Sequence, residues 1–162
     1  MGIRSTLDFS PQALTHSLPL IVERKKDLEC QDNLRRAQAG SFHDLYPFLS
    51  KNTEPYFTDK LPAYAIGLIL KARGDLLNLN GRAFKDNTLG LCTICNMDAV
   101  EDTHHLIGVC PIYRAYRLKY FGSRLLSREE VISVLNSNNF SNIFNFIKDC
   151  LQYRELIINE FS

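Results

Sequence analysis

Apolar residues recur at steps of three and four positions along much of this chain, the spacing that gathers side chains on one face of an α-helix. The clearest run starts at Phe140 and continues through Ile143, Phe144 and Ile147. Alternation with a period of two, which would indicate strands, is missing almost everywhere. The pattern predicts helices over residues 18–39, 62–73, 111–121, a short stretch after residue 127, and 140–161. The fold is therefore predicted to be all-α, or nearly so.

Proline, glycine and one serine mark the predicted helix ends. Proline fits the first turn of a helix, and three of the predicted helices carry one there: Pro19, Pro62 and Pro111. Glycine favours the position just after a helix, which is occupied by Gly40, Gly74 and Gly122. Ser127 is followed three residues later by Glu130, the pattern of a capping box that starts the next helix.

Size and composition indicate a globular chain within the range of one domain. The chain has 162 residues, of which 45% are hydrophobic and 23% charged. Its longest uncharged apolar run, residues 63–70, is eight residues, whereas a membrane span needs about 20. The first residues lack the apolar region of a secretory signal. We therefore expect a soluble intracellular protein, nuclear or cytoplasmic, with no membrane partner.

The charge of the chain is balanced overall but unevenly distributed. The formal net charge is +1. Residues 60–128 hold ten basic and five acidic side chains, a local surplus of five positive charges, whereas residues 129–162 are net acidic. A surplus of this kind can hold polyanions through counterion release, although charge alone favours a solvated surface of a neutral protein.

Cysteine and histidine residues are concentrated in one short segment. The spacing is Cys92-x2-Cys95-x9-His105-x4-Cys110, and His104 offers an alternative with gaps of eight and five residues. Five cysteines in a chain without a signal disfavour a disulfide framework. A redox dithiol would need a βαβ context that the pattern does not offer. Two convergent ligand pairs at finger-like spacing predict one Zn²⁺ ion as cofactor.

The ligand set also indicates the role of that zinc. Four sulfur and nitrogen ligands close the coordination sphere, whereas a catalytic zinc keeps one position open for water. The metal is therefore predicted to be structural. The sequence contains no paired carboxylates at helical spacing, no Ser/His/Asp set and no glycine-rich phosphate loop. We expect no enzymatic activity and no small-molecule substrate.

At these residues the sequence resembles a known family. The stretches from Cys92 to Cys95 and from Thr103 to Tyr113 resemble the Cys-Cys-His-Cys motif near the C-terminus of non-LTR (LINE-type) retrotransposon reverse transcriptases. That pattern has a short acidic stretch, matched by residues 97–102, and then Glu-His-Leu-Leu-x-x-Cys-Pro-x-Tyr. His105 matches the family histidine and His104 replaces the glutamate, so the resemblance favours His105 as the ligand.

The resemblance covers residues 60–123 and does not include a polymerase. Residues 69–80 are similar to the lead-in of the family motif, whereas the terminal helix fits loosely. The Tyr-x-Asp-Asp signature of the catalytic palm is absent. The chain therefore resembles the segment after the polymerase, as a fragment, a truncated element or a co-opted gene.

These observations predict four regions. They are a loosely ordered lead-in (1–17), a helical and turn-rich N-terminal part (18–59), a zinc-binding segment with flanking helices (60–123), and C-terminal helices that pack on the same domain (124–162).

The first functional hypothesis is a non-catalytic nucleic-acid-binding domain. In the family that the sequence resembles, the cysteine-rich segment helps hold RNA or DNA, and the resemblance implies the same role here. Zinc would join the basic residues around it into one surface with little sequence specificity. The predicted contacts are Lys71, Arg73, Arg82, Lys85, Arg114, Arg117 and Lys119. An exposed member of the interleaved Tyr113, Tyr116 and Tyr120 would stack on an unpaired base, although we expect two of the three to face the core.

The second hypothesis is a zinc-stabilised protein-interaction module. It would dock on another polypeptide, such as a reverse transcriptase core, through the acidic C-terminal residues 127–162. A folded but idle remnant of a decayed element is the third alternative.

Overall fold

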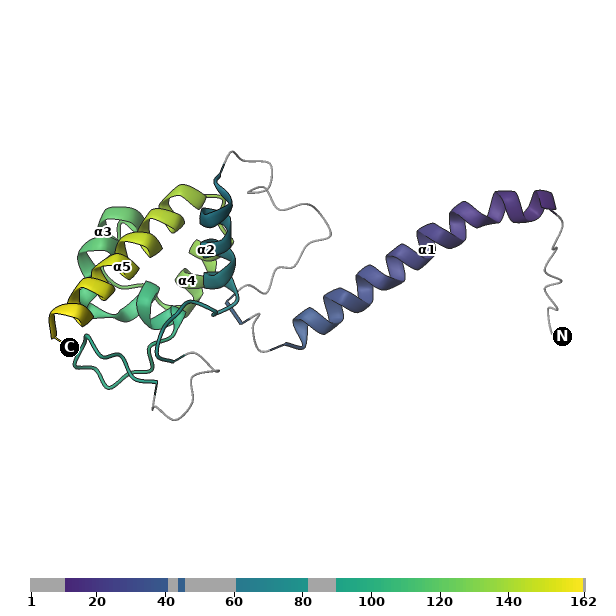
Figure 1. Cartoon of the computed structure of the whole chain (residues 1–162). Helices are drawn as coiled ribbons and strands as arrows, with labels where there is room; N and C mark the ends of the chain where they lie inside the picture. The colour runs from purple at the N-terminus through teal and green to yellow at the C-terminus, as the bar shows by residue number, and fades with distance from the viewer. Residues whose placement is uncertain (1–10, 41–43, 46–60, 82–89, 162) are drawn as a thin grey trace. The chain divides into compact units, whose positions relative to one another are not determined.

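The computed structural model describes residues 11–40, 44–45, 61–81 and 90–161 (Figure 1). Two compact units make up the chain, residues 1–39 and residues 40–162. The described residues form helices and turns with one isolated antiparallel bridge, between Leu91 and Val100, and no strand. The prediction of an all-α fold is confirmed.

The first unit contains helix α1 (Pro11–Gln38). The sequence predicts a loosely ordered lead-in over residues 1–17 and a helix that begins at Leu18, with Pro19 in its first turn. Residues 11–17 instead belong to α1, and Pro19 lies inside the helix. Pro11 explains this start, because proline fits the first helical position, where its missing N–H costs no bond. Residues 1–10 lie outside the described part of the chain.

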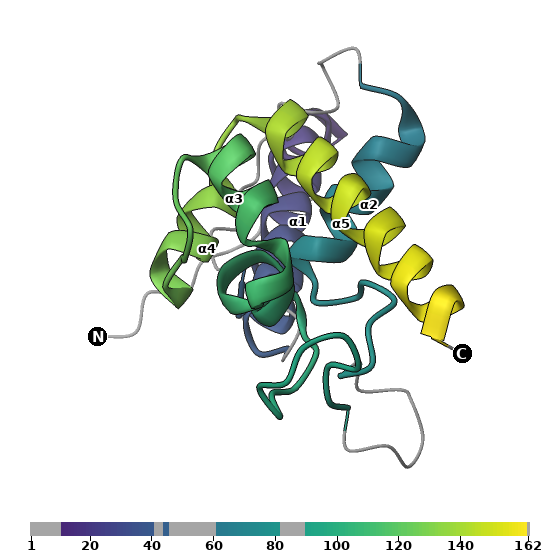
Figure 2. The same ribbon diagram turned by 90° about the vertical axis from the view of Figure 1, so that its left-hand side faces the viewer.

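The second unit is built around helix α5 (Phe140–Phe161). Figures 1 and 2 show α5 running alongside α2 (Ala63–Arg73) and α3 (Arg114–Phe121), against which it packs. The core residues between these helices are almost fully buried: Ile69 and Ala72 from α2, and Ile143, Phe146, Ile147 and Cys150 from α5. The C-terminal helices thus pack on the same unit as the cysteine-containing segment.

The predicted ends of these helices match the structure, except that Pro111 begins a short 3₁₀-helical turn, η4 (Pro111–Tyr113), and α3 follows it from Arg114. Pro62 is the N-cap of α2 and Gly74 its C-cap. Gly122 ends α3 with a φ of 71°, the left-handed conformation that glycine adopts without strain. Helix α4 (Arg128–Asn136) begins with the predicted capping box. The Ser127 N–H donates to Glu130 Oε2 over 2.7 Å, and the Glu130 N–H donates to Ser127 Oγ over 3.2 Å.

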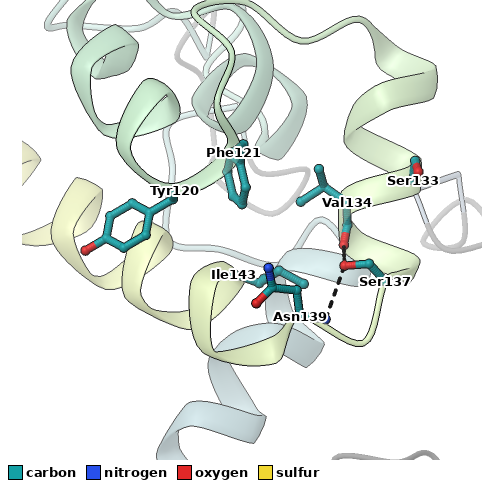
Figure 3. A pocket seen from close by; sticks show the side chains of 7 residues that line it. All are labelled: Tyr120, Phe121, Ser133, Val134, Ser137, Asn139 and Ile143. Atoms are coloured by element: carbon teal, nitrogen blue, oxygen red, sulfur yellow. Dashed lines mark hydrogen bonds between the residues drawn. The ribbon is translucent and has the colours of Figure 1, made fainter.

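An open groove lies between the end of α3, helix α4 and the start of α5 (Figure 3). Tyr120, Phe121, Val134 and Ile143 supply its apolar lining, and small polar residues complete it. The described residues that line it carry no carboxylate, amine, thiol or imidazole. The groove offers hydroxyl groups of tyrosine and serine beside its apolar lining.

Candidate metal centre

The structure brings Cys92, Cys95, His105 and Cys110 together in one buried cluster. Their ligand atoms all lie within 4.8 Å of one another. The Cys95 Sγ is 3.4 Å from the His105 Nε2. Around a tetrahedral zinc ion, sulfur and nitrogen ligands at normal bond lengths are about 3.5 Å apart. The four side chains are therefore close enough to hold one metal ion.

A tight turn positions the first two cysteines. The bridge between Leu91 and Val100 closes this turn, and the Cys92 N–H donates to the Ala99 carbonyl over 2.9 Å. Asp98 takes a φ of 48°, which aspartate tolerates better than most residues. Gly90 also has a positive φ, and a Cβ there would lie 2.9 Å from the Gly81 Cα. Glycine is thus needed where the two segments meet.

A π-helical turn, η3 (His105–Val109), positions the other two ligands. The Cys110 N–H donates to the His105 carbonyl over 2.8 Å, the five-residue bond of a π-helix. Asp102 stabilises the start of this segment by accepting the His105 N–H at Oδ1 over 2.6 Å. The wider turn explains how residues five positions apart reach the same point.

Hydrogen bonding and burial shift the pKa values of the three thiols. The side-chain hydrogen bond with Cys110 and burial together raise the pKa of Cys92 to about 12. The same hydrogen bond lowers the pKa of Cys110. Burial raises the pKa of Cys95. A bound metal ion takes up thiolates, so binding at neutral pH would release protons.

His104 is not a member of the cluster. It is only half-buried, and its Nε2 would lie 3.3 Å from a Cβ built on Gly108, in the next turn of the chain. That Nε2 has no hydrogen-bond partner among the described residues. The structure therefore brings His105, and not His104, to the three cysteines.

Two of the predicted nucleic-acid contacts are buried, which corrects that part of the sequence prediction. Arg73 is 3% exposed, and its Nε donates to the Leu135 carbonyl over 2.8 Å. Arg117 is 1% exposed, and its guanidinium donates to the carbonyls of Leu106, Cys110 and Arg124. Neither guanidinium can reach a phosphate. Arg117 instead holds the carbonyl of a cluster cysteine.

The other predicted contacts have different positions. Lys71, Arg114 and Lys119 are exposed. Lys119 forms an ion pair with Asp149, with 3.2 Å between the Nζ and Oδ2 atoms. Arg82 and Lys85 lie outside the described residues. The described cations therefore do not all belong to one basic surface, because Arg73 and Arg117 are buried and Lys119 is paired with Asp149.

The three tyrosines near the cluster contribute to packing. Tyr113 is 1% exposed, whereas Tyr116 and Tyr120 are half-buried. The Tyr116 ring lies 5.8 Å from the Tyr153 ring, and the Tyr120 hydroxyl donates to Asp149 Oδ2 over 2.5 Å.

Sequence reasoning missed a buried ion pair beside the cluster. Glu101 contacts the Cys92 Sγ through Oε1 over 3.8 Å, and Arg154 of α5 binds both oxygens of the same carboxylate. In the sequence, Glu101 stands out only as part of the acidic stretch of residues 97–102. Arg154 is 53 residues away, so local spacing gives no signal of the contact.

Comparison with known proteins adds no family. No protein-family model matches the chain, and the comparisons with curated proteins and with solved structures give no match either. Among the described residues, no helix combines the length and the apolar character needed to cross a membrane.

Proposed function

We propose that residues 61–161 form a helical domain organised by one structural Zn²⁺ ion. The observation that carries the proposal is the buried set of three thiols and one imidazole, all mutually within 4.8 Å. Soft sulfur and nitrogen donors in this number are the ligands that zinc prefers in structural sites. Zinc held by Cys92, Cys95, His105 and Cys110 would fix the turn around residues 92–99 against the π-helical turn.

The role proposed for the metal is structural and not catalytic. All four ligands come from the protein, which leaves no position for an activated water. The cluster residues are also at most 9% exposed, so a substrate has no access to them. Binding energy of a closed zinc site contributes directly to folding, on the order of 10 kcal/mol.

Metal analysis of the purified protein tests this proposal. We expect one zinc per chain, and a cobalt-loaded form with the absorption of tetrahedral thiolate coordination. Cys92→Ser, Cys110→Ser and His105→Ala should lose the metal and the cooperative melting transition. Cys30→Ser, in α1, and His104→Ala are the matched controls and should retain both. A zinc-free protein that melts cooperatively would contradict the proposal.

We further propose that this domain binds RNA or DNA with little sequence preference. Two observations support this proposal. Lys71 and Arg114 are exposed, and residues 60–123 resemble the post-polymerase segment of non-LTR reverse transcriptases. The buried Arg73 and Arg117 are no longer part of the proposed surface.

Fluorescence anisotropy with labelled single-stranded RNA, across a salt series, tests the partner. We expect binding that weakens steeply with salt and weakens further in a Lys71→Gln, Arg114→Gln variant. Glu155→Gln, on the exposed side of α5, serves as the control and should not weaken it. Absence of binding at low salt, by a protein with stoichiometric zinc, would favour the protein-interaction module instead.

A further inference from the structure

The carboxylate of Glu101 lies between the metal cluster and the last helix. Its side chain is 2% exposed. Oε1 is 3.8 Å from the Cys92 Sγ, and Oε2 accepts the Asn80 backbone N–H over 2.9 Å. One carboxylate thus contacts a cluster thiol and the segment that follows α2.

Arg154 binds this carboxylate with two hydrogen bonds. The Nε donates to Oε1 over 2.7 Å and one terminal nitrogen donates to Oε2 over 2.8 Å. The same nitrogen reaches the Asn80 Oδ1 over 3.3 Å. The Arg154 side chain is only 13% exposed, so the pair is shielded from water. Two-point binding in a buried setting fixes both position and orientation.

Zinc binding by the thiols would change the charge around the Glu101–Arg154 ion pair. Three thiolates and a neutral imidazole around Zn²⁺ carry one net negative charge. A buried carboxylate beside them adds a second negative charge, and like charges in a low-dielectric setting repel strongly. A cation is therefore needed at this point, and Arg154 supplies it.

We propose that Arg154 is a positioning residue of the metal centre. Its guanidinium offsets the negative charge of Glu101 and of the thiolates, and it anchors the turn around residues 92–99 to α5. This inference rests on the proposed zinc binding. It makes the affinity for metal depend on a residue of the C-terminal helix that does not touch the ion.

Zinc affinity, measured by competition with a chromophoric chelator, separates this role from that of an ordinary buried ion pair. Arg154→Met leaves Glu101 facing the thiolates, and we expect affinity to fall about 10-fold or more, as for other residues around a metal's ligands. Glu101→Gln removes the negative charge but keeps an acceptor for Asn80, so affinity should remain near that of the unmodified protein. Loss of a mere ion pair would instead weaken both variants alike.

Two further variants keep the test decisive if Arg154→Met folds poorly. Arg154→Lys retains the charge and should recover part of the affinity. The double variant Glu101→Gln, Arg154→Met removes both charges and should bind zinc more tightly than Arg154→Met alone. Arg124→Met, at an exposed arginine, is the control for charge removal and should bind zinc normally.

The cobalt-loaded proteins supply a second readout. Because Arg154 acts on the Cys92 segment, Arg154→Met should weaken the thiolate-to-cobalt absorption relative to the unmodified protein, whereas Glu101→Gln should retain it. Equal affinity and equal spectra for Arg154→Met and the unmodified protein would overturn the inference, and so would equal losses in both single variants. Failure of the unmodified protein to bind zinc or cobalt would overturn the proposed function itself.

Discussion

Helix α1 and the helices of the second unit are stabilised by different kinds of interaction. In α1, Leu18, Leu20 and Ile21 are more than half exposed. Its ion pairs join residues three or four positions apart, such as Lys25 with Glu29 and Asp32 with Arg36. Such local pairs contribute only a few tenths of a kcal/mol each.

Helix α3 shows the opposite balance. It has eight residues, fewer than an isolated helix needs to persist in water. Its stability comes from contacts with α5 and from Arg117, which donates to the carbonyls of Leu106 and Cys110 in the cysteine-containing segment. Helix length alone therefore does not account for what supports each helix, because the short helix α3 has tertiary contacts, whereas the ion pairs described for the long helix α1 are local.

Metal removal should have the largest effect of the changes considered, and this effect should differ between the two units. We expect chelation, or Cys110→Ser, to abolish hydrogen-exchange protection in α3 and α5, because the proposed zinc site would contribute on the order of 10 kcal/mol to folding. Exchange in α1 should not change, since its hydrogen bonds do not depend on the metal. Hydrogen exchange followed by mass spectrometry measures both regions in one experiment. Unchanged protection in α3 and α5 would contradict the contrast.

Replacing Arg117 tests the tertiary support of α3 directly. Arg117→Met removes the guanidinium that donates to three carbonyls, and we expect the free energy of unfolding to fall by about 3 kcal/mol. Arg114→Met, on the same helix but exposed, should change it by less than about 0.5 kcal/mol. Denaturant unfolding measures both. Similar effects of the two substitutions would mean that the buried arginine gives no special support.

The capping box of α4 should have an intermediate effect. Ser127→Ala removes the acceptor for the Glu130 N–H, and we expect a loss of about 1 kcal/mol in thermal or denaturant unfolding. Ser133→Ala, at an exposed position inside the same helix, is the control. Because alanine favours helix interiors, that variant should be neutral or slightly stabilised.

The smallest effect is expected in α1. The hydrogen bond from Arg35 holds the pKa of Asp32 below its ordinary value. A lowered pKa in the folded helix means that the contribution is present above the ordinary aspartate pKa and is lost as pH falls through the lowered value. Asp32→Asn should therefore reduce helical circular dichroism slightly at neutral pH and low salt, but not in acid or high salt. An effect that persists in high salt would point to a role beyond local ion pairing.

Sequence alone predicted the features that depend on local spacing. The apolar period located α2 and α5, and the pattern from Ser127 to Glu130 located the start of α4. The spacing of the cysteines selected residues that the structure gathers. These predictions succeeded because each depends on a pattern within one short segment of the chain.

Features that depend on tertiary contacts were missed or misassigned. Arg117 is predicted to belong to the basic surface around the zinc segment, yet it lies four residues after the buried Tyr113 and so on the same helix face. That spacing was the available signal. No such signal exists for Arg154, whose partner Glu101 lies on a segment far away in sequence.

The π-helical turn between His105 and Cys110 makes the length of this spacer a fixed property of the chain. An α-helical turn is closed by a bond between residues four positions apart, whereas this π-helical turn joins residues five positions apart. A one-residue deletion within residues 106–109 would replace the five-residue bond between Cys110 and His105 by a four-residue one and so move the imidazole relative to the sulfur atoms, with all four ligands still present. The length of this segment, and not only the identity of its ligands, therefore sets the geometry of the cluster.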